Sequence, residues 1–258
     1  MKFKGYFLDL VGTIVKGKSF EPYEGVQSVF NEIARNHKTL IITNNTTHHP
    51  ETIEKTLREK DFNTDGVTIL TPLTVLKKFL NEFSKKECFV VGNEVLVETV
   101  ESLGFEITKK EDAPLVVVGL DTQFNYEKIR KASSAILNGA ELWGLHRNRL
   151  YLKAGGELYP SVGATIAFLE YATGKTARIF GKPELDFYRT GLSIVGLAPE
   201  EVVVIGDDPF SEVEPPKRLG MHAIFLLGGK YKDRSILENI PEEFQPDSVL
   251  NKFVQLDL

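Results

Sequence analysis

The sequence has few of the residues that form disulfides, metal clusters or membrane-spanning segments. Its 258 residues contain one cysteine, Cys88, so an internal disulfide and a cysteine metal cluster are both excluded. No apolar run approaches the roughly 20 residues that cross a bilayer. The first residues also lack the apolar stretch and small-residue cleavage site of a secretory signal. These absences predict a cytoplasmic protein with no membrane partner.

Charge of one sign is also not in large excess. The net charge of −5 argues against a nucleic-acid groove, which needs a basic face, and any phosphate site would have to be made locally. Apolar residues make up 42% and charged residues 26%, as in ordinary globular proteins. A chain of this length can bury roughly 70–75% of its unfolded surface, so it suits one large domain or two small ones.

Short apolar segments alternate with longer amphipathic ones. Near-continuous apolar segments are typical of strands covered by helices on both faces of a sheet. The alternation predicts an α/β fold with a central parallel sheet. The predicted strands are residues 5–9, 39–43, 66–70, 88–91, 115–119, 178–181, 202–206 and 223–227. The predicted helices are about 24–36, 50–60, 72–83, 94–103, 126–138, 162–172, 184–195 and 216–220.

Polar residues follow three of these strands directly. Asp9 ends the first, Thr43 ends the second and is followed by Asn44, and Asp207 follows a late one. Ligands of open parallel sheets bind at the carboxyl ends of the strands, so these side chains are expected to share one site.

The middle of the chain has strands and helices of its own but no comparable set of acids. We therefore predict a discontinuous core of residues 1–82 and 178–258, with a second α/β domain inserted over residues 83–177.

The residue types at the strand ends suit phosphate chemistry. Each is unspecific alone, because an aspartate at the end of a strand is more often a turn or helix cap. Together, Asp9, Asp207 and Lys182 with a threonine indicate a metal and phosphate site. Mg²⁺ takes one or two carboxylates plus phosphate oxygens, and an anionic nucleophile meeting a phosphate needs such a cation. The lysine and threonine would bind the remaining phosphoryl oxygens.

Four ordered motifs carry a family resemblance. They are FLDLVGT at 7–13, ITNNTT at 42–47, FGKPELDFY at 180–188 and VIGDDPFSE at 204–212. With these motifs the chain resembles the haloacid dehalogenase-like (HAD) superfamily, and within it the NagD and 4-nitrophenylphosphatase branch. The segments 116–132 and 156–174 resemble that branch's large α/β cap. The resemblance implies a Rossmann-like core with an inserted cap domain.

The resemblance also implies a reaction. It is Mg²⁺-dependent hydrolysis of phosphate monoesters, such as sugar phosphates or 4-nitrophenyl phosphate. Asp9 would be the nucleophile and would form an aspartyl-phosphate, which splits one difficult displacement into two easier ones. The metal would be held by Asp9, the backbone carbonyl of Val11, and Asp207.

Further residues of the motifs would form the substrate pocket. The resemblance implies that Thr43 and Lys182 bind the phosphoryl group. Asn44 and the backbone amides of Gly12 and Thr13 would shape the pocket around it.

Val11 departs from the family pattern. Phosphatases of the family have a second aspartate here, as general acid and base, and valine carries no proton. Losing such a group typically slows a reaction about 10²–10⁴-fold. We therefore expect weak activity, or activity limited to aryl and acyl phosphates, whose leaving groups need no proton. Phosphonatases and dehalogenases also lack the aspartate, but neither matches the large inserted domain. The alternative is a non-catalytic module that binds a phosphorylated ligand or a protein partner.

Glu212 is a second departure, because the family usually has aspartate there. It is still expected to bind a metal-bound water, with Asp208 as the alternative. The prolines at 215 and 216 fit the start of a helix and not its interior, so the helix that follows is expected to begin late.

Histidines raise two open questions. His146 lies in a segment expected to face the site, where it could donate the missing proton and contact substrate. The favoured alternative is a solvated basic loop with Arg147 and Arg149. His48 and His49 either reach the pocket rim or, as favoured, only add polarity where a helix begins. The branch often pairs through its cap, so a homodimer is a further option that the sequence leaves open.

Overall fold

The computed structural model describes residues 3–17, 19–152 and 157–257. The chain divides into two compact units, which are described separately. The first contains residues up to 43, residues 50–70 and residues from 182 onward, and the second contains Asn44–His49 and Thr71–Gly181.

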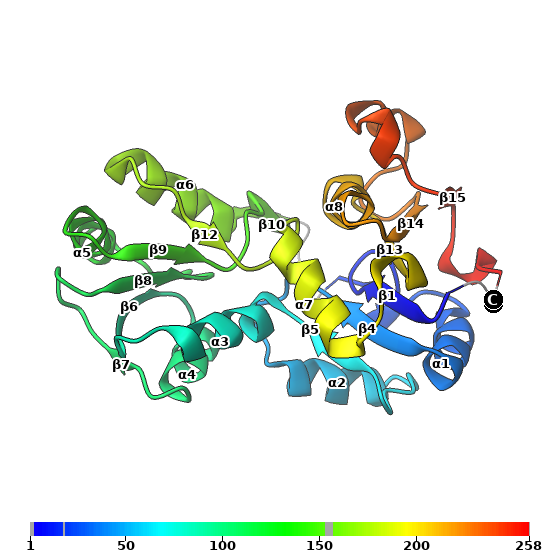
Figure 1. Cartoon of the computed structure of the whole chain (residues 1–258), viewed down its shortest axis with the longest axis horizontal. Coiled ribbons are helices and arrows are strands. Elements are labelled where there is room, and N and C mark those ends of the chain that lie inside the picture. The colour runs from blue at the N-terminus through cyan, green and yellow to red at the C-terminus, as the bar shows by residue number, and fades with distance from the viewer. Residues whose placement is uncertain (1–2, 18, 153–156, 258) are drawn as a thin grey trace. The chain divides into compact units, whose positions relative to one another are not determined.

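A six-stranded parallel sheet forms the centre of the first unit (Figure 1). Its order is β15-β14-β13-β1-β4-β5, with bounds β1 Gly5–Asp9, β4 Lys38–Ile42, β5 Thr68–Leu70, β13 Val202–Gly206, β14 His222–Leu226 and β15 Ser248–Leu250. The chain builds outward from β1 in one direction and from β13 in the other, so the strand order reverses between these two neighbours. Leu8 pairs with Ile205, which brings the residues after both strands to one edge. This switch point is where ligands of open α/β sheets bind.

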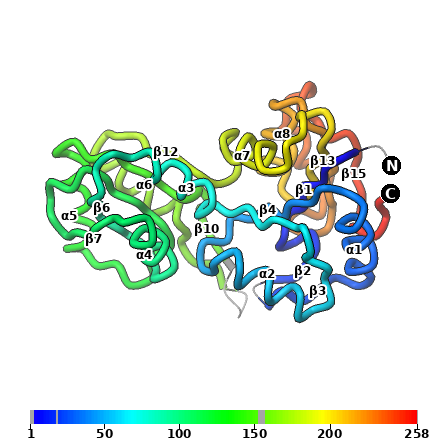
Figure 2. Tube along the Cα trace, turned by 60° about the horizontal axis from the view of Figure 1, so that its bottom comes forward, coloured from blue at the N-terminus to red at the C-terminus, as the bar shows by residue number. Residues whose placement is uncertain are grey.

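Helices cover both faces of this sheet (Figures 1 and 2). On one side are α1 (Val26–Asn36) and α2 (Pro50–Arg58), and on the other are α7 (Leu185–Val195) and α8 (Glu214–Arg218). The strand side chains alternate between the faces. Tyr6 and Leu8 belong to the core that α1 and α2 bury, whereas Phe7 faces α7. A Cβ atom on Gly191 would lie 2.7 Å from the Phe7 ring, so α7 packs closely on the sheet.

Short elements complete the first unit. An antiparallel hairpin of β2 (Val15–Lys16) and β3 (Glu21–Pro22) follows β1 closely. The short helical turns are Pro199–Glu201, Pro209–Val213, Arg234–Asn239, Glu242–Phe244 and Phe253–Gln255. Of these, Pro209–Val213 has π-helical geometry and follows β13.

The second unit has its own five-stranded parallel sheet. Its order is β12-β9-β8-β6-β7, with bounds β6 Glu87–Val91, β7 Glu106–Ile107, β8 Leu115–Val118, β9 Glu141–Gly144 and β12 Arg178–Ile179. Its helices are α3 (Pro72–Glu82), α4 (Glu94–Glu101), α5 (Tyr126–Leu137) and α6 (Val162–Thr173). Helices α3 and α4 lie on one side of the sheet and α5 and α6 on the other (Figure 1). A hairpin of β10 (Leu150–Leu152) and β11 (Leu158–Pro160) precedes α6.

The predicted α/β class with a central parallel sheet is confirmed. Each predicted helix and strand has a counterpart within a few residues. The strands that prediction missed are short, and β9 has only the apolar pair Leu142 and Trp143 in its centre. Residue 156 of the cap-like segment lies outside the described residues.

The boundary at residues 83 and 177 stays a prediction, although the second unit also includes α3 and residues 44–49. The ring of Phe79 on α3 packs against that of Phe180, at 5.3 Å between centroids.

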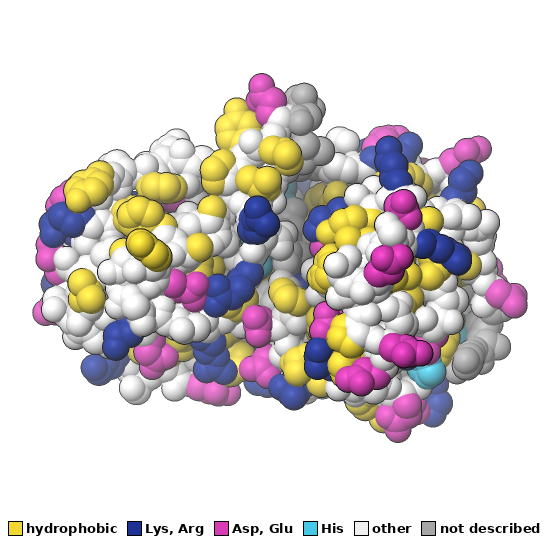
Figure 3. Space-filling view, turned by 90° about the horizontal axis from the view of Figure 1, so that it is seen from above, with side chains coloured by type: hydrophobic (Ala, Val, Ile, Leu, Met, Phe, Trp, Pro, Cys, Tyr) yellow, Lys and Arg dark blue, Asp and Glu magenta, His cyan; other side chains and the backbone are white. Residues whose placement is uncertain are grey.

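The structure bears on the charge and the hydropathy of the chain. Figure 3 shows basic and acidic side chains mixed over one face of the molecule. In the part of the chain that the structure describes, every helix is too short or too polar to cross a membrane.

Candidate active site

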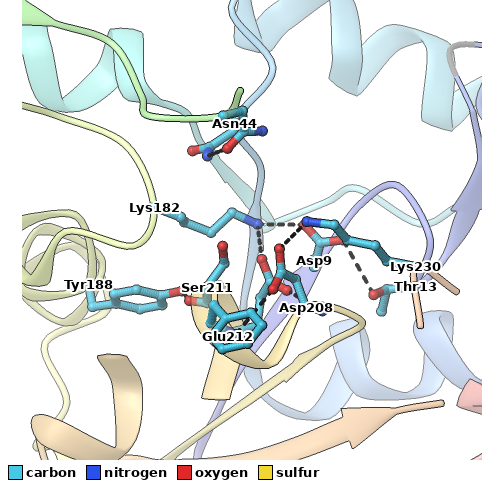
Figure 4. Close-up of polar contacts among 11 residues, drawn as sticks. Asp9, Thr13, Asn44, Lys182, Tyr188, Asp208, Ser211, Glu212 and Lys230 are labelled. Atoms are coloured by element: carbon cyan, nitrogen blue, oxygen red, sulfur yellow. Dashed lines mark hydrogen bonds and ion pairs between the residues drawn. The ribbon is translucent and has the colours of Figure 1, made fainter. Parts of the chain in front are cut away.

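Asp9 ends β1 at the switch point and is held by two side chains (Figure 4). Its Oδ1 accepts a hydrogen bond of 2.6 Å from Lys182 Nζ, and its Oδ2 accepts one of 3.3 Å from Thr13 Oγ1. Only 6% of the residue is exposed. The carboxylate is therefore oriented by both of its oxygens.

Lys182 lies between two carboxylates. Its Nζ donates to Asp9 and, over 2.8 Å, to Glu212 Oε1. Burial disfavours the ammonium, but the charges of Asp9 and Glu212 outweigh burial and raise the pKa of Lys182. Lys182 thus stays protonated and presents a buried positive charge beside Asp9.

The turn Pro209–Val213 delivers Glu212 to this lysine. Glu212 Oε2 accepts from the backbone amide of Asp208 over 2.8 Å, so both carboxylate oxygens have partners in the protein. The Tyr188 hydroxyl, from α7, donates to the Ser211 carbonyl and anchors the turn (Figure 4). Burial holds the pKa of Glu212 well above its usual range, against the opposing charge of Lys182.

The helix after this turn begins late, as predicted. Helix α8 starts at Glu214, so Pro215 and Pro216 lie in its first turn, where their missing amides cost no helical hydrogen bond.

Asp207 follows β13 and lies beside the loop from β14. Its Oδ2 accepts a hydrogen bond of 2.6 Å from the Lys230 backbone amide. Two glycines permit this close approach. A Cβ atom on Gly12, where φ is +98°, would lie 2.0 Å from Asp207 Oδ2, and one on Gly229 would lie 2.3 Å from the same atom. Burial raises the pKa of Asp207 to about 7, and the charge of Asp9 adds to the increase.

Asp208 is neutralised by another lysine. Its Oδ2 pairs with Lys230 Nζ, and its Oδ1 accepts from the Phe210 backbone amide over 3.1 Å (Figure 4). Lys230 therefore contacts both acids of the motif, Asp207 through its backbone and Asp208 through its side chain.

The donor set fits a magnesium ion. The four carboxylates of Asp9, Asp207, Asp208 and Glu212 face two ammonium groups, which leaves two negative charges when all are ionised. Burial and the negative charge of Asp9 raise the pKa of Asp207, and a bound cation would oppose both effects. Within the described residues, no group of three or more Asp, Glu, His or Cys side chains is arranged to hold a metal ion by itself. A metal here would therefore need other oxygens, from the Val11 carbonyl, water or phosphate, as Mg²⁺ accepts.

The remaining predicted residues of the first unit lie near the same sheet edge. Thr43 follows β4, is buried, and donates its backbone amide to the Leu70 carbonyl over 3.1 Å. The Gly12 amide donates to the Val15 carbonyl over 2.9 Å, so its phosphate contact stays a prediction. The Val11 side chain, after Asp9, is 40% exposed.

Asn44 and His146 belong to the second unit. Asn44 Nδ2 donates to Asn148 Oδ1 over 3.2 Å, and the Asn148 amide donates to His146 Nδ1 over 3.2 Å. His146 is 4% exposed and is therefore not part of a solvated loop. Arg147, by contrast, lies at the surface and pairs with both oxygens of Glu170. The role of His146 as a proton donor stays a prediction.

His48 and His49 have local partners. His49 Nε2 pairs with Glu98 at 2.8 Å, and His48 Nδ1 lies 3.2 Å from Asn45 Nδ2 and from Thr47 Oγ1. These contacts agree with polarity at the start of α2.

Prediction missed Tyr188 and Lys230. The signal for Lys230 was the Gly228-Gly229-Lys230 sequence directly after an apolar strand, where two glycines indicate a close backbone approach. Tyr188 lay within a quoted motif but carried no separate signal.

Comparison with known proteins decides the family. Residues 6–106 match the family described as haloacid dehalogenase-like hydrolase, and residues 179–256 match a second HAD hydrolase-like family. The chain is 30% identical over 231 residues to mouse (Mus musculus) haloacid dehalogenase-like hydrolase domain-containing protein 2, covering 89% of this chain and 86% of that protein. The chain belongs to the haloacid dehalogenase-like hydrolases.

Other relatives of this HAD-like hydrolase agree with the predicted branch. Acid sugar phosphatase of Staphylococcus aureus (strain USA300) is 28% identical, over 95% of this chain and 93% of that protein. The p-nitrophenyl phosphatase structure from Archaeoglobus fulgidus has a TM-score of 0.84 at 28% identity, covering 98% and 97% of the two chains. NagD from E. coli K-12 shares the fold, with a TM-score of 0.86 over 100% and 99% of the two chains at 22% identity. The predicted NagD and 4-nitrophenylphosphatase branch is confirmed.

Proposed function

We propose that this HAD-like hydrolase is a Mg²⁺-dependent phosphatase that transfers the phosphoryl group of a small phosphate monoester to Asp9 and then to water. The observation that carries the proposal is the buried Asp9 carboxylate, held by Lys182 and Thr13 at the switch point. The names of its relatives, an acid sugar phosphatase and a p-nitrophenyl phosphatase, support phosphate monoesters as the substrate class.

Asp9 suits the role of nucleophile because both of its oxygens are oriented. Lys182 Nζ donates to one oxygen over 2.6 Å, and the Thr13 hydroxyl donates to the other. As the substrate arrives, Lys182 and Thr43 would bind the phosphoryl oxygens, where they stabilise the charge that spreads over them during transfer. Holding the nucleophile in line with phosphorus converts a bimolecular step into an effectively unimolecular one.

Asp9, the Val11 carbonyl and Asp207 would hold the magnesium ion. Bound Mg²⁺ would offset the repulsion between the phosphate and Asp9. The Lys230 amide fixes the rotamer of Asp207, and Lys230 Nζ keeps the neighbouring Asp208 paired. The predicted contact of Glu212 with a metal-bound water stays a proposal, because both Glu212 oxygens are bonded within the protein here.

Val11 limits the choice of substrate. An exposed valine beside Asp9 cannot protonate a departing alkoxide, so sugar and other alkyl phosphates should react about 10²–10⁴-fold more slowly than with an acid in place. Aryl oxides and carboxylates leave as stable anions. We therefore propose that aryl and acyl phosphates are the better substrates.

The test is hydrolysis of 4-nitrophenyl phosphate and of a sugar phosphate by wild type and Asp9→Asn, with Mg²⁺ and with chelator. The proposal expects turnover of the aryl ester that needs both Mg²⁺ and Asp9, and much slower turnover of the sugar ester. Turnover that persists in Asp9→Asn would contradict it. Phosphate-analogue binding without any turnover would favour the alternative of a binding module, which Val11 alone supports.

A further inference from the structure

We infer that Asp9 is phosphorylated for most of each catalytic cycle. The protein then accumulates as an aspartyl-phosphate whose hydrolysis is the slow step. The inference rests on the proposed function, and it concerns which of the two half-reactions the environment of Asp9 supports.

The first half-reaction needs no proton when the substrate is activated. An Asp9 carboxylate oxygen attacks phosphorus, and the bond from phosphorus to the leaving oxygen breaks with its electron pair. An aryl oxide or carboxylate departs as an anion. Lys182 donates to Asp9 over 2.6 Å and orients the carboxylate for this attack. The step needs no proton donor at position 11, so the exposed Val11 side chain does not slow it.

The second half-reaction does need a proton acceptor. A water oxygen attacks phosphorus, the bond to Asp9 breaks with its electron pair, and Asp9 returns as a carboxylate. The attacking water must also lose a proton, and because valine at position 11 cannot take it, the proton passes to a phosphoryl oxygen or to solvent. Water attacking without a positioned base loses about 10²–10⁴-fold in rate.

The ionisable groups around Asp9 are already engaged. Lys182 Nζ donates to both Asp9 and Glu212 and so has no role as an acceptor. Glu212 is 3% exposed, and its two oxygens are bonded to Lys182 Nζ and the Asp208 amide, so water does not reach them. Asp208 is paired with Lys230, whereas Asp207 accepts the Lys230 amide through its Oδ2 and is one of the residues that would hold the magnesium ion.

In the second unit, the Nδ1 atom of His146 accepts the Asn148 amide proton, so the lone pair of this nitrogen is already used.

The consequence is a large increase in the fraction of enzyme that is phosphorylated during turnover. If the two half-reactions would have similar rates with a base present, slowing the second about 100-fold leaves about 99% of the enzyme phosphorylated at saturating substrate. Asp9 would then act as a store of phosphoryl groups, filled by an aryl or acyl phosphate and emptied slowly.

The experiment is a rapid-quench time course with saturating 4-nitrophenyl phosphate and Mg²⁺, followed by intact-mass analysis of the acid-quenched protein. The expected result is a burst of about one 4-nitrophenol per active site and then a slow linear phase. The protein should gain the mass of one phosphoryl group, mapped by peptide analysis to Asp9 and removed by hydroxylamine.

Position 11 supplies matched variants. Val11→Asp adds a base, so with half-reactions of similar rate the phosphorylated fraction should fall from about 99% to about half, the burst should shrink to about a quarter of a site, and the steady-state rate should rise about 50-fold. Val11→Asn has nearly the same shape without the base, so its burst and adduct should persist. Asp9→Asn should show neither.

The outcomes separate the inference from the proposed function. Wild type that hydrolyses the ester linearly, with Mg²⁺ dependence but no burst or adduct, overturns the inference and leaves the phosphatase intact. A burst without an adduct points to slow product release and also overturns it. Neither product nor adduct from wild type would reject the proposed function itself.

Discussion

Replacing Asp207 with asparagine should stabilise the metal-free protein at neutral pH. Burial first, and then the charge of Asp9, raise the pKa of Asp207 from the ordinary 3.8 to about 7. A difference of this size corresponds to about 4 kcal/mol. Asparagine can still accept the Lys230 amide through its Oδ1, so the substitution removes the charge and keeps the hydrogen bond.

The sign of this effect depends on pH in a defined way. Below about pH 4 the Asp207 carboxyl is protonated in both folded and unfolded chains, and its burial costs nothing through ionisation. Between about pH 4 and 7 the unfolded chain gives up the proton while the folded protein keeps it, so stability falls as the pH rises. Above about pH 7 the full cost is present.

Thermal melting in chelator from pH 4 to 8 measures this cost. Relative to wild type, Asp207→Asn should gain nothing near pH 4 and on the order of 10 °C in melting temperature at pH 8. Glu238→Gln, which changes an exposed acid of the same unit, is the control and should follow wild type. Saturating Mg²⁺ should raise the melting temperature of wild type and leave Asp207→Asn unmoved. A difference between the two proteins that does not change with pH would refute the reasoning.

Three further substitutions test the geometry of the site. Gly12→Ala should weaken Mg²⁺ binding at least tenfold by calorimetry, because the added Cβ would lie 2.0 Å from Asp207 Oδ2. Gly17→Ala is the control, since Gly17 also has a positive φ (+53°) but its Cβ would have no atom within 4 Å. Glu212→Gln should lower the melting temperature and the rate of 4-nitrophenyl phosphate hydrolysis together, because glutamine has one acceptor oxygen for the two donors, Lys182 Nζ and the Asp208 amide, and leaving one buried donor unpaired costs about 1–3 kcal/mol; unchanged melting would contradict this. Tyr188→Phe should cost about 1–3 kcal/mol in urea unfolding, because it leaves the part-buried Ser211 carbonyl of the turn without this donor, and an effect below about 0.5 kcal/mol would count against that anchor.

Local patterns predicted most of the fold. The run from residue 5 to 9 is buried throughout, and continuous burial of this kind requires a strand covered on both faces. Helix α1 followed from its spacing of Val26, Phe30 and Ile33, which turns one apolar face toward the sheet. Strand β9 escaped prediction because only its two central residues are apolar and large, so its place in the sheet depends on pairing with β8.

The candidate site was predictable where its residues end strands. Asp9 and Asp207 each follow an apolar run, and neighbouring parallel strands bring such ends together. Lys182 and Glu212 were both found through their motifs, but their pairing was not predicted, because it depends on how the π-helical turn folds beside Lys182.

The sequence by itself determined the class of chemistry, because strand-end carboxylates, a lysine and a missing acid at Val11 are facts of residue type and order. Tertiary structure alone decided how these groups are paired. Lys182 meets Asp9 across 173 residues of chain, and the Lys230 amide meets Asp207 across 23. No local pattern encodes such contacts, because they depend on where separate loops converge when the sheet and its helices pack. The same packing buries the carboxylates, and burial is what moves the pKa of Asp207 to about 7.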